Sequence, residues 1–100
     1  MPRYLIVRRF SVGEDEMPVI GRRSREIAEQ QFPEIVWEHS HVVIDSAGTP
    51  KSYCVYDAPS EEMVREHSRL LGDHFIEEIY EIAGDVTPAD FPLTDDPTTN

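Results

Sequence analysis

Alternating apolar and polar residues mark four extended segments in this chain. Each segment is rich in β-branched and aromatic residues and is bounded by glycine, proline, aspartate or serine, as strands commonly are. We therefore predict strands at residues 4–10, 35–44, 52–56 and 75–82. The intervening loop 45–50, Asp-Ser-Ala-Gly-Thr-Pro, predicts a hairpin between the second and third strands.

Two segments between these strands carry apolar residues at helical spacing. The first helix is predicted to begin at a cap at Asp15 and to end at the Phe32-Pro33 pair. The second is predicted to begin at Ser60 and to stop at Gly72. Their predicted buried faces consist of Met17, Ile20, Ser24, Ile27, Ala28 and Gln31 in the first helix and of Met63, Val64, His67, Leu70 and Leu71 in the second.

The order strand, helix, strand, strand, helix, strand predicts an α+β protein of the ferredoxin-like βαββαβ type, with an antiparallel four-stranded sheet. Two helices cover only one face of such a sheet, yet the first strand presents Leu5 and Val7 on one side and Tyr4 and Ile6 on the other. A solvated face would alternate more cleanly. We therefore expect a homodimer that packs its sheet faces into an α+β barrel. The alternative is a monomer whose C-terminal tail covers the open face.

The division of the chain follows the change in composition after the fourth strand. We place a ferredoxin-like domain at residues 1–83 and an acidic tail, rich in proline and threonine, at residues 84–100. The tail has too few apolar residues to form a core, so we expect it to be loosely held. Phe91 and Leu93 are the residues expected to dock on the body of the protein.

Charge and composition narrow the possible partners. The formal net charge of -11 would repel phosphates, so we expect neither nucleic acid nor an anionic membrane surface as a partner. No apolar run is long enough to span a bilayer and no secretory signal pattern is visible, so we expect a soluble, cytoplasmic protein. Cys54 is the single cysteine, which excludes an internal disulfide.

The most informative candidate chemistry lies in the hairpin. His39 and His41 are two residues apart in a strand, so they share one face. If the hairpin is symmetric about the Ala-Gly pair of its loop, His41 lies opposite Cys54 and His39 opposite Tyr56, and all four side chains converge on one patch. A loop one residue longer or shorter would move Cys54 and Tyr56 to the other face.

The candidate metal ligands are His39, His41, Cys54, His67 and His74, because imidazole and thiolate suit nickel and other borderline transition metals. Each also has a simpler interpretation. His67 lies in an apolar stripe and could be a core residue that donates to a backbone carbonyl, and Cys54 could be a small buried hydrophobe. The strand histidines could be a polar patch or a dimer contact. His67 can join them only if their face lies under the helices.

The blocks His39-Ser40, Cys54–Pro59, Glu66-His67 and Ile79–Ile82 resemble a family of small bacterial proteins. Most members are described as a domain of unknown function, and some as nickel-binding proteins. The resemblance covers about residues 3–82 and implies a dimeric ferredoxin-like fold with metal binding in some members. Metal-binding relatives tend to carry a histidine in the first strand, where this chain has Arg8 and Arg9, so His41 and His74 would have to supply imidazoles instead.

Two function classes follow, and the sequence leaves both open. The first is a transition-metal-binding protein of the nickel type without catalytic activity. The second is a small dimeric barrel enzyme, such as a monooxygenase, isomerase or cyclase. In that enzyme His39 or His41 would be the base, Tyr56 the proton donor and Arg8 an anion clamp in the cleft between sheet and helices. The enzyme interpretation rests on analogy at the level of the fold. A scaffold without a small ligand is a third possibility.

Overall fold

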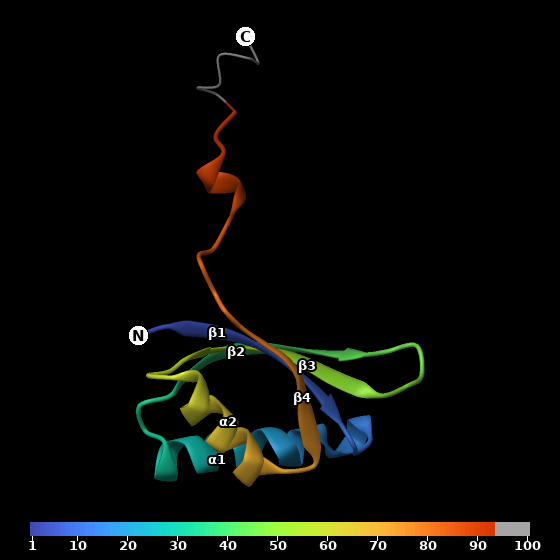
Figure 1. Cartoon of the computed structure of the whole chain (residues 1–100). Coiled ribbons are helices and arrows are strands. Elements are labelled where there is room, and N and C mark those ends of the chain that lie inside the picture. Colours follow the sequence, from blue (N-terminus) through green and yellow to red (C-terminus); the bar gives the residue numbers. More distant parts are fainter. Residues whose placement is uncertain (94–100) are drawn as a thin grey trace.

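The computed structural model describes residues 1–93 and shows one antiparallel sheet with both helices on the same face (Figure 1). The spatial strand order is β2-β3-β1-β4, so β1 and β3 are central and β2 and β4 are edges. The α+β class and the antiparallel four-stranded sheet are confirmed, and the arrangement is compatible with the predicted ferredoxin-like fold. The elements are β1 (Arg3–Phe10), α1 (Met17–Gln31), β2 (Val36–Ile44), β3 (Pro50–Asp57), α2 (Glu61–Leu71) and β4 (His74–Glu81), with 3-10 turns at Glu14–Glu16 and Pro88–Asp90.

The predicted boundaries of α2 are confirmed, whereas the predicted cap of α1 is wrong. Ser60 caps α2 as predicted, because its side-chain oxygen accepts from the Met63 backbone N–H at 3.2 Å. Gly72 ends the same helix at a positive φ of 71°, which glycine adopts without strain. Asp15 does not cap α1 but lies in the preceding 3-10 turn.

The helix faces that pack on the sheet are narrower than the predicted ones. Ile20, Ser24 and Ala28 are the buried residues of α1, and Gln31 is exposed. In α2, Val64, His67 and Leu71 are buried, whereas Leu70 is 46% exposed. The prediction that Gln31 and Leu70 are buried is therefore wrong. Each lies at the margin of its apolar stripe, where helical spacing alone does not decide burial.

Alternation along the central strands gives the sheet two different faces. On the face covered by helices, Tyr4 pairs with Tyr56 and Ile6 with Cys54, and these side chains form the main core with Val64 of α2. On the opposite face, which we call the open face, Leu5 pairs with Val55 and Val7 with Tyr53. Residues 1–93 place no helix over the open face.

The register of the β2–β3 hairpin differs from the predicted one by one residue. Ile44 pairs with Pro50, so the loop is centred on Ala47 and His41 pairs with Tyr53 rather than with Cys54. The carboxylate of Asp45 fixes this loop, since its Oδ1 accepts from the backbone N–H groups of Ala47 and Thr49, each at 2.9 Å. The shift moves both strand histidines to the open face, away from Cys54.

A bulge in β2 adds a second change of face. The pairing shifts between Trp37 and His39, so that Trp37 lies opposite Tyr56 while His39 lies opposite Val55. The indole therefore points to the helix side and the imidazole to the open side, although both residues have odd numbers. The predicted pairing of His39 with Tyr56 is wrong because of the loop register, since His39 and His41 share one register and the bulge lies before both.

The C-terminal segment leaves the sheet on the side opposite to the helices and runs away from it (Figure 1). Its base is tied to β1 by a backbone bond from Ile82 to Arg3 and by a 2.8 Å ion pair between Arg3 and Asp85. Phe91 is 65% exposed, so its expected docking on the body is wrong, and Figure 1 shows that the segment after β4 runs away from the sheet instead of covering the open face. The remainder of the predicted tail lies outside the described residues, and the domain boundary at residue 83 stays a prediction.

No helix of the described chain has the combination of length and apolar character that a membrane crossing requires.

We expect Asp45→Ala to lower the thermal midpoint and to loosen the hairpin register, because the loop amides and Arg9, 2.7 Å away, lose their common acceptor. Asp45→Asn should be milder, since it keeps an oxygen for the amides but loses the charge toward Arg9. Cross-strand contacts between His41 and Tyr53 in solution, together with thermal unfolding, measure both effects. Ser46→Ala in the same loop is the control, and an equal effect of Ser46→Ala would contradict this role of Asp45.

Candidate functional site

The five candidate metal ligands do not form one cluster. His39 and His41 lie on the open face of β2, and Cys54 lies under the helices on β3. His67 is buried in α2, and His74 begins β4 at the other edge of the sheet. Within residues 1–93, no group of three or more His, Cys, Asp or Glu side chains is arranged to hold a metal ion. The prediction that the hairpin side chains converge on a single patch is therefore wrong.

The two strand histidines do remain a pair. The ring centroids of His39 and His41 lie 5.5 Å apart with an interplanar angle of 73°. Both residues are exposed and belong to an edge strand, so their ring nitrogens can be reached from outside. Two imidazoles at this spacing can share one ion, and the other positions of that ion would have to be filled by donors from outside this chain.

His67 is a core residue with its own hydrogen bonds. Its side chain is fully buried, and its Nε2 donates to the Ser24 carbonyl oxygen at 3.0 Å. The Ser24 hydroxyl lies 3.4 Å from the same nitrogen and 3.3 Å from the Tyr56 hydroxyl. Burial lowers the pKa of His67, and the nearby charge of Arg8 lowers it further. The neutral ring thus joins α2 to α1, as the core interpretation expected.

His74 is held in a similar local way. Its Nδ1 donates to the Gly72 carbonyl oxygen at 2.7 Å, and its ring lies 5.4 Å from the ring of Phe10. The side chain is partly buried, and this burial lowers the pKa of His74. Because Phe10 lies on the helix-covered face, His74 cannot join the two strand histidines within one chain.

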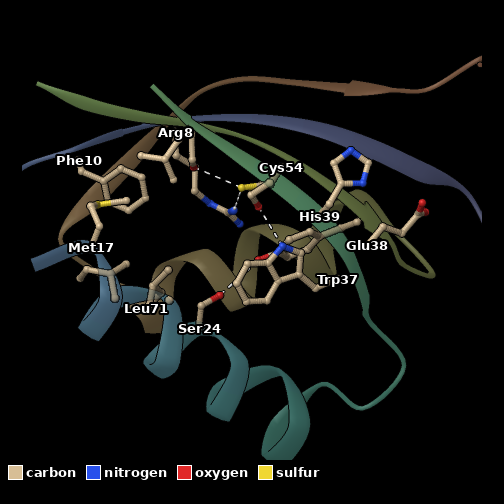
Figure 2. A pocket seen from close by; sticks show the side chains of 15 residues that line it. Arg8, Phe10, Met17, Ser24, Trp37, Glu38, His39, Cys54 and Leu71 are labelled. Carbon is tan, nitrogen blue, oxygen red and sulfur yellow. Dashed lines mark hydrogen bonds between the residues drawn. The ribbon is translucent and has the colours of Figure 1, made fainter. Parts of the chain in front are cut away.

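A cavity of about 420 Å³ opens between α1, β2 and the centre of the sheet (Figure 2). Its apolar wall includes Phe10, Ile20 and Leu71, and its polar wall includes Tyr56 and a set of hydroxyl groups. The indole of Trp37 lies at its side and donates from Nε1 to Ser40 at 2.9 Å. The cavity exists because β2 extends past the helices, so that its helix-side residues are only partly covered; Val42, for example, is 53% exposed.

Arg8 is the unusual residue of this cavity. It is 2% exposed, and its Nη1 donates to the Cys54 sulfur and its Nη2 to the Ser68 hydroxyl, each at 3.0 Å. Its guanidinium carbon lies 5.0 Å from the centre of the Tyr56 ring, a cation–π contact. The sequence predicted Arg8 and Tyr56 as site residues and Ser24 as a buried residue, but it did not predict a role for Ser52, which lines the cavity, or for Ser68, which accepts from Arg8. The available signal was an arginine that interrupts the apolar alternation of β1 on the helix side.

The residues required for the enzyme interpretation are only partly brought together. Arg8 and Tyr56 line the cavity, but His41 lies on the open face and is not part of the lining. His39 borders the cavity at its rim, and Figure 2 shows its ring directed away from Arg8 and Cys54. The cavity is therefore a binding space with an arginine and a phenol, without the two histidines proposed as bases.

The fold and these groups define a small α+β protein with an exposed histidine pair on one sheet face and an arginine-containing cavity on the other. The family model of the nickel-responsive protein SCO4226-like matches residues 4–82. The chain therefore belongs to the SCO4226-like family of nickel-responsive proteins, and the resemblance drawn from the sequence is confirmed. No curated protein and no solved structure matches the chain.

We expect the unfolding free energy to fall as the pH drops through about 6.5, the ordinary histidine pKa. His67 has a lowered pKa in the folded chain, so below that pH the unfolded chain takes up a proton that the folded one still refuses. His74 adds to the slope for the same reason. His67→Gln should flatten the slope between pH 7.5 and 5.5, two values that bracket the ordinary histidine pKa of about 6.5, measured by urea unfolding. The exposed His41→Gln is the control, and an unchanged slope in His67→Gln would refute the assignment.

Proposed function

We propose that this protein binds nickel, or another borderline transition metal, through His39 and His41 and that it acts without catalysis as a homodimer joined through its open sheet faces. The observation that carries the proposal is the accessible histidine pair on the open face. Imidazole is a preferred ligand of nickel, zinc and copper, and membership of a nickel-responsive family favours nickel.

The same pair gives a reason for a second copy. The described part of one chain offers two neighbouring imidazoles and no third ligand beside them. Donors from another chain could complete the coordination, and they are available where two open faces meet. A site shared between copies would also tie metal binding to assembly, because each event stabilises the other.

The open face has the composition of a surface that packs against protein. Its centre contains Val7 and Val55, which are 6% and 8% exposed, and around them Phe75, Tyr80 and Val43 are 57%, 52% and 39% exposed. Exposed apolar side chains that gather on one face in this way are typical of an interaction site. A second copy is the partner that always supplies a complementary apolar face, since a two-fold interface uses the same residues twice.

Several charges of this face already form ion pairs, which lowers the cost of covering them. Glu77 accepts from Arg9 at 2.9 Å and from Lys51 at 2.8 Å, and Arg9 also contacts Asp45 at 2.7 Å. The Lys51 and Arg9 cations hold the pKa of Glu77 below its usual range, so the carboxylate stays ionised inside the network. A partner that covered this network would bury neutralised groups rather than free charges.

The proposal predicts that nickel affinity depends on the strand histidines. His39→Ala combined with His41→Ala should lower the affinity at least about tenfold, because loss of an outer-shell partner alone costs that much. Isothermal titration with Ni²⁺, on protein purified without a nickel column and treated with a chelator, measures this. His74→Ala is the matched control on the other edge of the sheet. Wild-type affinity in the double variant would overturn the assignment.

A second prediction concerns assembly. Phe75→Glu combined with Tyr80→Glu should shift the protein from dimer to monomer, because each chain then brings two charges into the apolar interface. Both side chains are more than half exposed, so the fold should persist. Light scattering after gel filtration gives the mass. Val19→Glu, at a 62% exposed apolar position on α1, is the control that should remain dimeric. A monomeric wild-type protein would contradict the proposed dimer but leave the histidine test intact.

A further inference from the structure

Arg8 is a buried cation that lacks an acidic partner. It is 2% exposed, and none of the ion pairs within residues 1–93 includes it. Its hydrogen bonds go to a thiol and a hydroxyl, and its Nε is buried without any partner. A guanidinium carries five N–H donors, so most of its capacity is unused. Burying a charge in this way is costly unless an opposite charge joins it.

The carboxylate that borders the cavity is already bound to another arginine. Glu38 borders the cavity, but its two oxygens accept from Arg3 at 2.8 and 3.1 Å. The histidines near Arg8 cannot supply negative charge, and the charge of Arg8 contributes to the lowered pKa of His67 and of His74. None of the described acidic side chains therefore forms an ion pair with Arg8.

The cavity beside Arg8 has room for a ligand that carries such a charge. It holds about 420 Å³, which lies within the usual range of small-molecule sites. The wall formed by Phe10, Met17, Ile20 and Leu71 is apolar, whereas Arg8 and the hydroxyl groups of Ser24 and Tyr56 are polar. Figure 2 shows the guanidinium pointing inward between these two kinds of wall. An apolar body with one anionic end matches this division.

We propose that the cavity between α1 and the sheet binds a small carboxylate with an apolar body, and that Arg8 recognises the carboxylate. Arginine is suited to this because its planar fork matches the two oxygens of a carboxylate. The apolar body would lie beside Phe10, Ile20 and Leu71 and would cover Trp37 and Val42, which are 36% and 53% exposed, so that apolar surface is removed from water. This site lies on the face of the sheet opposite to His39 and His41 and does not depend on the proposed metal site.

Trp37 makes the proposal easy to test. It is the single tryptophan of the chain and it lines the cavity, so its fluorescence reports a bound molecule directly. Octanoate and octanol are the probes, because they share an apolar chain and differ in charge. We expect octanoate to change the Trp37 emission in a saturable way. Octanol should bind about ten- to a hundredfold more weakly, as hydrogen bonds between charged groups predict.

Two variants examine the charge and the space separately. Arg8→Met should remove the preference for octanoate over octanol. Gly21→Leu should block both probes, because Gly21 lines the cavity and an added side chain meets no atom within 4 Å at its Cβ. Leucine in place of glycine also favours a helix, so α1 should remain folded. Gly84→Leu, at another glycine with open space around it, is the control that should bind as the native chain does.

The outcomes separate the site from its alternatives. If octanoate and octanol bind equally, or if neither binds, Arg8 does not recognise an anion and the proposal is overturned. If Arg8→Met does not fold, the comparison of the two probes and the Gly21→Leu variant still decide. His41→Ala, at the histidine of the pair that does not line the cavity, should keep octanoate binding even if it weakens nickel binding, so the two sites can fail independently.

Discussion

The register of the β2–β3 hairpin is the constraint on which the rest of this structure depends. Asp45 holds the loop through two backbone amides and an ion pair to Arg9, and the Thr49 amide is the main cause of its lowered pKa. Since strand side chains alternate with a period of two, a loop one residue longer or shorter would exchange the faces of β2. The position of this small turn therefore decides which groups meet.

The consequence is a sheet whose two faces carry different chemistry. The open face presents the imidazoles of His39 and His41 beside exposed apolar residues and a closed network of charges. The helix side presents Arg8, Tyr56 and Cys54 at a cavity. The bulge at β2 sharpens this separation, because it places Trp37 on the cavity side while the next residues of the strand keep their histidines outside. A metal function and an anion function can thus occupy one small domain on opposite faces of the sheet, with His39 at the border between them.

Residue types and their spacing predicted part of the candidate site correctly and missed another part. The helical spacing correctly placed His67 toward the sheet, and the interpretation as a core residue agrees with its bond to the Ser24 carbonyl. The proximity of Cys54 to Arg8 was not foreseen, because these residues come from different strands and meet only through the β1–β3 register. Ser52 and Ser68 could not be recognised from the sequence, since a lone serine in a strand or helix does not by itself indicate a binding site.

The sequence by itself determined the order of the elements, the α+β class, the cap at Ser60 and the family, because these depend on local spacing and on short motifs. The tertiary structure decided which face each hairpin residue occupies, since one residue of loop length and one bulge are too small to read from alternation. It also decided the burial of Arg8: the apolar alternation of β1 marks this position, but a charged side chain is usually exposed. The burial of Arg8 is long-range, because β1 meets Cys54 of β3 and Ser68 of α2, whereas the hairpin register depends on one small loop.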